Sequence, residues 1–349
     1  MPYQRVRQLG CGHFGEVWLE HDLALDRLCA AKYLDPARLA GGSFDEAKAM
    51  LDAEHENVVR VYAADLEQPV VAGGSPVPVI RMEYLPNGSL QERYGGEPGP
   101  VADVVRAIED SARGVEALHS RGVLHRDIKP GNLLIADDRR IKVSDFGLAC
   151  HSGAGGNAPP WGYLPHLPPE AVAVAVGIDT AVGDVYAIGV TAYRLLNGDA
   201  MLHSALPPGG DLRDRIVQGK YPDPNRWQPH VHDGLRRVVR KAMHPDSAKR
   251  YASASELRHA FEQVRPAVSW VPVGGETTSA WQGADPTSGR IWTAVATSNA
   301  RGGWDFALQR QALGGKLRSV RSDGRTGLNE VTVLRQAARV MQRVAATGR

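Results

Sequence analysis

The stretch that decides the fold runs from residue 125 to residue 134 and reads His-Arg-Asp-Ile-Lys-Pro-Gly-Asn-Leu-Leu. It sets an acid, a cation and an amide at fixed offsets: Asp127, Lys129 and Asn132. A proline and a glycine stand between the cation and the amide, and both disfavour the interior of a helix. The three polar side chains are therefore predicted to lie on a loop.

Three more motifs accompany this loop. Upstream lie the glycine-rich run 10–17 (Gly-Cys-Gly-His-Phe-Gly-Glu-Val) and the triplet Ala30-Ala31-Lys32. Thirteen residues after Asn132 comes the triplet Asp145-Phe146-Gly147. Each motif alone is a weak signal, but the four in this order are a strong one. Together they resemble the eukaryotic-type (Hanks-type) bacterial Ser/Thr protein kinase family.

The glycine-rich run is ambiguous when it is taken alone. Similar runs occur in dinucleotide-binding folds, where a helix follows them. Here residues 16–19 (Glu-Val-Trp-Leu) have the pattern of a strand, which favours a kinase hairpin lying over the phosphates of ATP. A glycine-rich turn without any ligand remains an alternative for the motif by itself.

The resemblance implies a site for ATP and Mg²⁺ between two lobes. Asp127 would orient the substrate hydroxyl and accept its proton, and Lys129 would steady the transferring phosphoryl group. Asn132 and Asp145 would each bind a magnesium ion, because Mg²⁺ prefers hard oxygen ligands. ATP and Mg²⁺ are therefore the expected cofactors.

The resemblance also implies which residues surround the nucleotide. Lys32 would hold the α- and β-phosphates and pair with a glutamate on the next helix. Glu46 is the best placed partner, and Asp45 and Glu54 are its rivals. The residues expected to bind the nucleotide are Gly10, Gly12, Gly15, Val17, Ala30, Lys32, Glu83, Leu85 and Leu134.

Downstream motifs extend the resemblance to about residue 264. Residues 167–170 (Leu-Pro-Pro-Glu) resemble the end of the family's activation segment, and residues 184–190 resemble its buried central helix. Arg250 matches the arginine that pairs with the glutamate at position 170. These residues have structural roles in the family.

One position departs from the family's pattern. Tyr163 stands where a Ser/Thr kinase usually has a threonine that hydrogen-bonds the catalytic loop. Between Asp145 and Glu170 there is no threonine and one serine, Ser152. We therefore expect a kinase that is active without a phosphate on this segment, or one that is gated by its C-terminal domain.

The pattern along the chain predicts an α+β protein with a bilobal protein-kinase fold and a small C-terminal α+β accessory domain. Residues 1–85 are expected to form a lobe with a five-stranded sheet and one helix, at 44–53. Residues 86–265 are expected to form a mostly helical lobe. In the accessory domain, residues 267–349, strands are expected at 268–273 and 290–297, and a helix capped by Asn329 is expected from Glu330 to about Ala346.

Composition limits the protein class. The 349 residues are 43% hydrophobic and 23% charged, which is typical of globular proteins. The three cysteines are far apart and suggest neither a disulfide framework nor a metal site, as is typical of a reducing cytoplasm. No signal stretch or membrane anchor is evident, so a cytoplasmic location is expected.

Positive charge is concentrated in the last residues. Residues 301–349 hold ten Lys and Arg against three Asp and Glu, a balance of 10 − 3 = +7, while the whole chain has a net charge of +2. Four of the seven tryptophans also lie in the C-terminal domain. A surface for an acidic partner or a nucleic acid is one interpretation. A solvated helix face with tryptophans in a small core is the other.

Three functions are consistent with these motifs. The preferred one is a Ser/Thr protein kinase that acts on a protein hydroxyl and phosphorylates itself. A pseudokinase scaffold usually lacks one of the residues at positions 32, 127 and 145, whereas this chain has all three. A kinase-fold phosphotransferase for a small molecule is disfavoured by Lys129 and by the complete segment that ends at Glu170.

Overall fold

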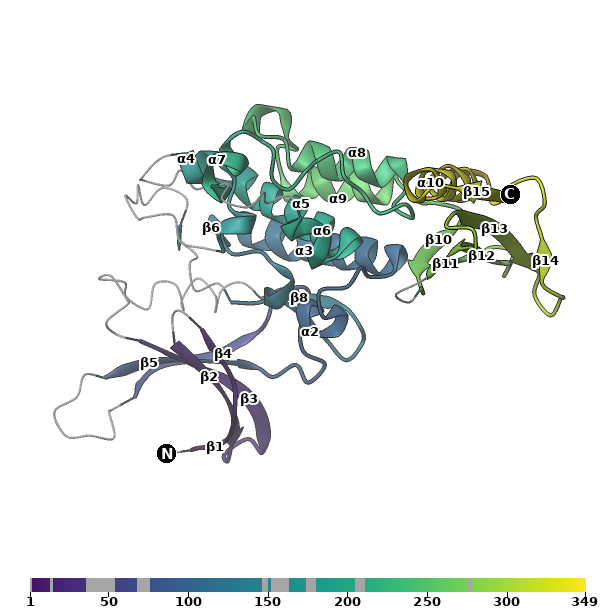
Figure 1. The fold of residues 1–349 in the computed structure, drawn as a ribbon. Coiled ribbons are helices and arrows are strands. Elements are labelled where there is room, and N and C mark those ends of the chain that lie inside the picture. Colours follow the sequence, from purple (N-terminus) through teal and green to yellow (C-terminus); the bar gives the residue numbers. More distant parts are fainter. Residues whose placement is uncertain are drawn as a thin grey trace.

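A computed structural model describes residues 2–12, 15–35, 54–67, 76–145, 150–151, 163–173, 180–204, 211–274 and 278–349. It has a strand-rich N-terminal lobe, a helical lobe, and a third unit beyond the helical lobe (Figure 1). The bilobal α+β fold and its extra C-terminal unit agree with the prediction. The helix expected at 44–53, which includes Glu46, lies outside the described residues.

The N-terminal lobe is built on a five-stranded antiparallel sheet with the order β1-β2-β3-β5-β4. Asp22 ends the second strand, and its carboxylate accepts hydrogen bonds from the amides of Ala24 (3.1 Å) and Leu25 (3.2 Å). This Asx-type turn reverses the chain into the third strand. The strands are β1 (Tyr3–Gly12), β2 (Gly15–Asp22), β3 (Arg27–Leu34), β4 (Val61–Glu67) and β5 (Val77–Glu83).

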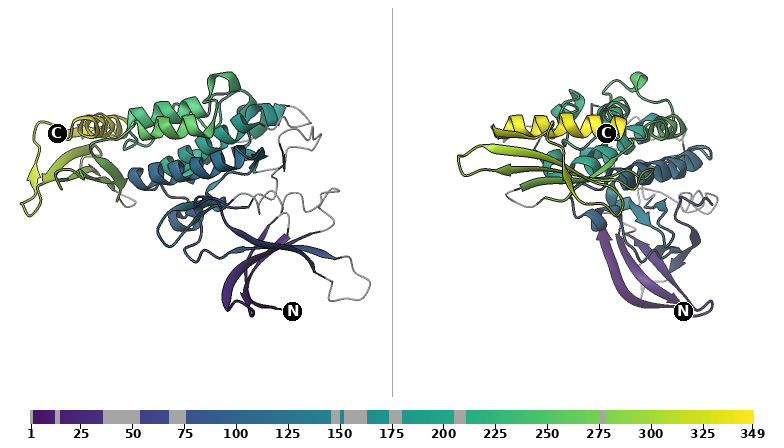
Figure 2. Two further views of the ribbon diagram at one scale, coloured as in Figure 1. Left: turned by 180° about the vertical axis from the view of Figure 1, so that it is seen from behind. Right: turned by 90° about the vertical axis from the view of Figure 1, so that its right-hand side faces the viewer.

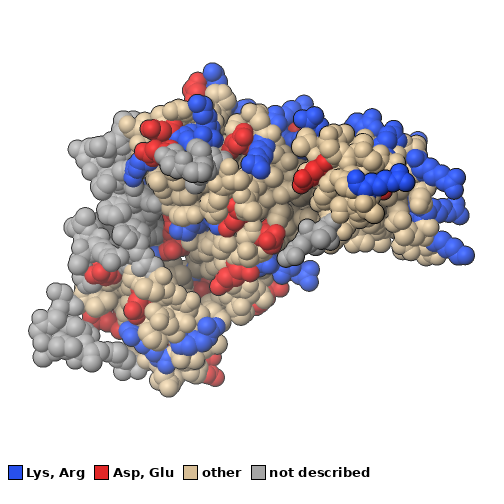
Figure 3. All heavy atoms as spheres, in the orientation of Figure 1, with Lys and Arg blue, Asp and Glu red and all other residues tan. Residues whose placement is uncertain are grey.

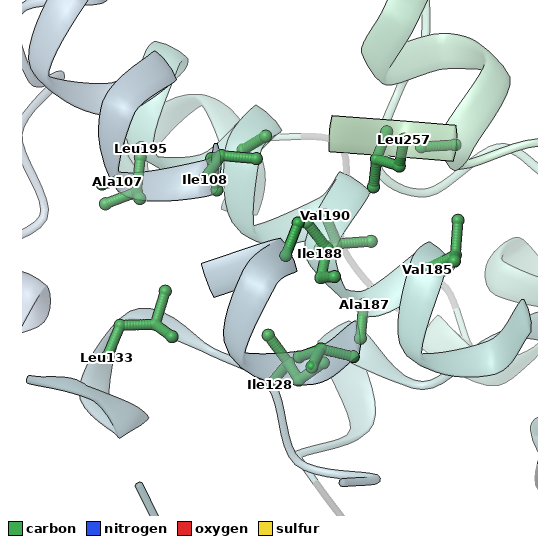
Figure 4. Packing of buried hydrophobic residues seen from close by; sticks show 14 of the residues in the cluster. Ala107, Ile108, Ile128, Leu133, Val185, Ala187, Ile188, Val190, Leu195 and Leu257 are labelled. Carbon is green, nitrogen blue, oxygen red and sulfur yellow. The ribbon is translucent and has the colours of Figure 1, made fainter. Parts of the chain in front are cut away.

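The helical lobe is organised around α5 (Ala181–Asn197), which is buried on nearly every side. A helix that is apolar all round must lie in the interior, and here α3 (Val101–His119) packs against it. Figure 4 shows side chains of both helices meeting in one core. Shorter helices complete the lobe: α2 (Leu90–Tyr94), α4 (Pro169–Ala173), α6 (Asp199–His203), α7 (Leu212–Val217), α8 (Asp233–Ala242) and α9 (Ala254–Glu262).

Four short strands support the loop at 125–132. β6 (Val123–Leu124) precedes the loop and pairs with β9 (Cys150–His151). β7 (Leu133–Ile135) follows it and pairs with β8 (Ile141–Val143). The loop is therefore fixed at both ends by strands. Its last residues, Pro130–Asn132, form a single 3₁₀ turn, and residues 125–132 contain no α-helix, in agreement with the predicted loop.

The C-terminal unit, residues 267–349, is a sheet covered on one face by a long helix. The final helix, α10 (Glu330–Thr347), begins after Asn329, whose side chain accepts a hydrogen bond from the Thr332 amide (2.8 Å), which confirms the predicted cap. The sheet contains more strands than were predicted, in the order β10-β11-β12-β13-β14 with β15 against β13. They are β10 (Ser269–Pro272), β11 (Thr278–Ala284), β12 (Ile291–Ser298), β13 (Trp304–Gln311), β14 (Arg318–Ser319) and β15 (Arg325–Leu328).

The C-terminal unit is joined to the helical lobe by hydrogen bonds to the starts of two helices. Ser269 Oγ accepts from the Ala102 amide in the first turn of α3 (3.0 Å). The Gln342 side chain accepts from the Asp233 amide at the start of α8 (2.8 Å) and donates to the Val231 carbonyl (2.7 Å). These contacts satisfy amides that helix starts leave without intrahelical partners. The unit thus lies beside the helical lobe and away from the N-terminal sheet (Figure 2).

No helix among the described residues is both long enough and apolar enough to cross a bilayer.

Candidate active site

The glycine-rich run joins β1 to β2 at the edge of a cleft. Gly15 has a φ of +144°, and a Cβ at this position would collide with the backbone of Tyr33 on β3, so a glycine is required. A Cβ at Gly10 would meet no atom within 4 Å, and this residue lines the cleft. Gly12 ends β1, opposite Gly15. The missing side chain thus allows β2 to pack against β3 at Gly15, and at Gly10 it leaves the edge of the cleft open.

Lys32 lies in the middle of β3 with its side chain buried. Its ammonium donates to the carboxylate of Asp145, which is 113 positions away in the chain. Burial alone would raise the pKa of Asp145, but the charge of Lys32 and its hydrogen bond hold this pKa below its ordinary value. Asp145 also has a φ of +62°, a conformation that costs energy in a non-glycine residue.

The partner predicted for Lys32 can be followed only in part. Glu46 and its rival Asp45 lie outside the described residues. The other rival, Glu54, is 72% exposed and lies 3.1 Å from Arg60 Nη2. Glu54 is therefore engaged elsewhere, and Asp145 is the carboxylate bound to Lys32 among the described residues.

Asp184, near the start of α5, holds the backbone at the beginning of residues 125–132, which are the expected catalytic loop. Its carboxylate accepts the amides of His125 (2.9 Å) and Arg126 (2.8 Å), and the ring of His119 lies 2.7 Å away. Burial would raise the pKa of Asp184, but His119 and the His125 amide keep it below its ordinary value. Arg126 has a φ of +70°. The buried carboxylate therefore stabilises a turn that an isolated chain would disfavour.

His125 connects the loop to the segment containing Asp145. Burial lowers the pKa of this histidine, so the ring is neutral and one nitrogen can accept a hydrogen bond. Nδ1 accepts from the Asp127 amide (3.2 Å), and Nε2 donates to the Ser144 carbonyl (3.0 Å). A single buried ring thus ties the catalytic loop to the residue that precedes Asp145.

Asp127 is held by donors on both of its carboxylate oxygens. Lys129 Nζ lies 2.6 Å and Asn132 Nδ2 lies 3.0 Å from Oδ2. The backbone amide of Tyr163 donates to Oδ1 (3.2 Å). Asn132 Nδ2 also donates to the Asp127 carbonyl (2.8 Å). No described residue donates a hydrogen bond to the side-chain oxygen of Asn132, Oδ1. The carboxylate is preorganised, while an oxygen of Asn132 remains available to a cation.

Tyr163 reaches the catalytic loop through its backbone. In the family that this chain resembles, a threonine at this position usually hydrogen-bonds the catalytic loop, whereas here the backbone amide of Tyr163 donates to Asp127. The ring instead lies beside cations, with Lys129 Nζ and Arg194 Cζ each 5.9 Å from its centroid. The departure from the family's pattern therefore leaves Asp127 with a hydrogen bond that any residue other than proline could supply.

A cavity of about 510 Å³ lies between the two lobes. It brings together residues that were predicted from five separate stretches of sequence. The backbone amide of Glu83, a residue predicted to bind the nucleotide, already donates to the Arg60 carbonyl (2.9 Å). Of the backbone groups of Glu83, only the carbonyl is therefore free to bind adenine. The predicted residues that line the cavity are Gly10, Val17, Ala30, Lys32, Glu83, Leu85, Asn132, Leu134 and Asp145.

The structure adds lining residues that were not predicted. Glu92 and Ser89 line the cavity, and they form a capping box at the start of α2 in which Ser89 Oγ accepts from the Glu92 amide (3.2 Å). The pattern Ser-x-x-Glu is a signal that the sequence alone could have supplied. Arg7 and Ser144 also line it, and no motif points to them.

Comparison with known proteins assigns the family. Residues 3–262 match the model of the protein kinase domain. The chain belongs to the protein kinase domain family. It is 29% identical to the serine/threonine-protein kinase PrkC of Bacillus subtilis, over 73% of this chain and 39% of that protein. It is 31% identical to the serine/threonine-protein kinase PknB of Mycolicibacterium smegmatis, over 73% of this chain and 42% of that protein.

A third relative is the serine/threonine-protein kinase PknB of Mycobacterium tuberculosis, which is 30% identical over 73% of this chain and 42% of that protein. The chain therefore spans about two fifths of the length of these curated relatives. The family model ends at residue 262, so the C-terminal unit lies outside it.

Proposed function

We propose that this kinase domain transfers the γ-phosphoryl group of ATP to a serine or threonine hydroxyl of a protein. The observation that carries the proposal is the convergence of Lys32, Asp145 and Asn132 on one cavity, next to a fixed Asp127. The names of the relatives support the same class of reaction.

In the proposed reaction, Asp127 orients the substrate hydroxyl and accepts its proton as the oxygen attacks the γ-phosphorus. The bond between this phosphorus and the oxygen bridging to the β-phosphate breaks, and ADP leaves. Lys129, bonded to Asp127 at 2.6 Å, places positive charge where the transferring group is most negative. The Tyr163 amide and Asn132 keep the carboxylate from rotating away.

The donor set fits Mg²⁺. A carboxylate from Asp145 and the amide oxygen of Asn132 are hard oxygen ligands, and both residues line the cavity. When bound, the ion would neutralise phosphate charge. Lys32 would contact the α- and β-phosphates, and Glu46 is proposed as the residue that positions Lys32.

The adenine ring is proposed to lie between apolar side chains from both lobes. Val17 and Ala30 come from the N-terminal sheet and Leu134 from β7, and all three line the cavity. Backbone groups of Glu83 and Leu85 are proposed to bind the ring edge. Autophosphorylation and transfer to a separate protein are both proposed, as is activity without a phosphate on Ser152.

Phosphotransfer from radiolabelled ATP tests the function. Wild-type protein should label itself and a generic basic protein, whereas Asp127→Asn and Lys32→Met should lose at least about a hundredfold in rate. Asp138→Asn and Lys220→Met are matched controls, since both residues are exposed and lie outside the cavity. Both controls should keep wild-type rates.

The scaffold interpretation predicts a different result. A wild-type protein that is stabilised by ATP with Mg²⁺ in a thermal shift assay, yet transfers no label, would favour a pseudokinase. For the activation segment, stoichiometric phosphate on Ser152 in active enzyme together with an inactive Ser152→Ala variant would overturn the proposed independence from phosphorylation.

A further inference from the structure

The turn after β13 presents two leucines to the surroundings. The Gly315 amide donates to the Ala312 carbonyl (2.8 Å), and Gly314 has a φ of +68°, so the chain reverses tightly here. Leu313 lies at the corner of this turn and is 85% exposed, and Leu317 is 52% exposed. Leu313 is the most exposed large hydrophobic residue described in the chain. The turn thus holds two aliphatic side chains, four residues apart in the sequence, where a partner can reach them.

The same tip is strongly basic. Arg310 on β13 and Arg318 on β14 lie directly opposite each other in the strand register. Like charges at opposed positions destabilise a strand pair unless an anion lies between them. Lys316 and Arg321 lie on either side of Arg318 in the sequence, and all four cations are exposed. None of the four has a carboxylate partner among the described residues.

The tip lies at the far end of the molecule. β14 is the part of the C-terminal unit farthest from the two lobes in Figure 1. In the same orientation, Lys and Arg gather at that end and few acidic side chains are visible there (Figure 3). A flat partner could therefore approach the tip without meeting the lobes that form the cleft.

We propose that this tip, residues 310–321, docks on the surface of an anionic lipid bilayer. Leu313 and Leu317 insert at the boundary between headgroups and acyl chains, and the four cations bind lipid phosphates. A bilayer accepts protruding aliphatic side chains without a shaped pocket. The proposal is independent of catalysis, because no residue of the tip lines the cleft.

The sequence alone left a nucleic acid open as a partner of this basic region. The structure favours a lipid surface over a nucleic acid. Proteins that bind single strands stack bases on aromatic side chains. Residues 310–321 contain no aromatic residue, and the exposed apolar groups there are leucines. Cations alone would bind either partner. The exposed Leu313 and Leu317 favour the bilayer, because they can insert among its lipids.

Sedimentation of the full-length chain with vesicles tests the proposal. Wild-type protein should bind vesicles of equal parts phosphatidylglycerol and phosphatidylcholine, bind weakly to pure phosphatidylcholine, and lose affinity as salt rises. Arg318→Gln should lower the affinity about fivefold, and Leu313→Gln should lower it about tenfold. Phosphotransfer in solution should be unchanged in both variants.

Two matched controls separate the tip from general surface effects. Leu25→Gln removes a leucine that is 62% exposed in the N-terminal lobe. Arg301→Gln removes an exposed cation from the loop between β12 and β13, at the opposite end of those strands. Both should bind vesicles like wild type.

Three results would overturn the proposal. They are equal binding to neutral and anionic vesicles, vesicle binding that Leu313→Gln leaves unchanged, and salt-dependent binding to a poly-uridylate oligonucleotide without vesicle binding. The last result would assign the cations to nucleic acid.

Discussion

The kinase domain and the C-terminal unit differ in how many polar side chains they bury. Nearly all buried polar or charged side chains among the described residues lie in the kinase domain, and they include His125, Asp184 and Arg250. In the C-terminal unit, Asp323 is the exception. Its core is instead built from Trp270, Trp281 and Trp292 with the apolar face of α10.

This difference follows from what each part has to do. A buried polar group costs stability unless it is hydrogen-bonded, so it is kept where it fixes a geometry. In the kinase domain, the buried carboxylate of Asp184 holds Arg126 at a positive φ, directly before Asp127. In the C-terminal unit, an apolar core leaves the charges outside, where they can meet a partner.

The largest expected effect comes from Asp184→Asn. Loss of the buried charge weakens the hydrogen bonds from His125, Arg126 and His119, so the free energy of unfolding should fall by about 3–5 kcal/mol. Urea unfolding followed by circular dichroism measures it. Asp103→Asn is the control, because Asp103 is 47% exposed and should change stability by less than about 0.5 kcal/mol. Equal losses would mean that the buried hydrogen bonds of Asp184 add nothing to the stability of the kinase domain.

A second prediction concerns acid stability. Burial and the neighbouring Arg194 lower the pKa of His166 from an ordinary 6.5 to about 3. In the unfolded chain His166 therefore takes up a proton as the pH falls through about 6.5, whereas in the folded chain it takes one up only at about pH 3. The stability that the folded state gains from keeping His166 neutral is fully present above pH 6.5 and is lost as the pH falls from 6.5 to about 3. His166→Gln should flatten the slope of unfolding free energy against pH by up to about 1.4 kcal/mol per unit, as measured by urea titrations at several pH values. Identical slopes in both proteins would contradict it.

The third prediction tests whether the two parts are independent. Gln342→Ala removes the bonds to Asp233 and Val231 and should destabilise the chain by about 1–3 kcal/mol. Thermal unfolding provides the measurement. Gln282→Ala, at an exposed position on β11, should be nearly neutral. If both variants behave alike, the C-terminal unit is an independent module and not an extension of the helical lobe.

The smallest effect is expected at the start of α10. Asn329→Ala removes the side chain that accepts the Thr332 amide, so the C-terminal unit should lose about 1 kcal/mol. Asn329→Ser should keep most of that stability, because serine also caps helices. Hydrogen exchange of the α10 amides would measure the change within this unit. A loss in the kinase domain instead would show that the two cores are coupled.

Local signals in the sequence were enough for several elements. They predicted the cap at Asn329 and the break at Pro130. The family resemblance predicted the pairing of Glu170 with Arg250, and Arg250 Nη1 lies 2.7 Å from a Glu170 carboxylate oxygen. Family motifs also pointed to most of the residues that line the cleft. Most strands of the C-terminal unit were missed, because their alanines, threonines and glutamines give little contrast between the two faces.

The sequence by itself determined the order of the motifs and hence the family, since each motif depends on short spacings that a loop or hairpin imposes. Only the tertiary structure decided that Asp184 holds the backbone of the catalytic loop, that Tyr163 acts through its amide, and that Arg310 faces Arg318. Each of these contacts joins segments whose separation along the chain carries no periodic signal. The register of strands and the packing of helices bring them together, and both are properties of the whole fold.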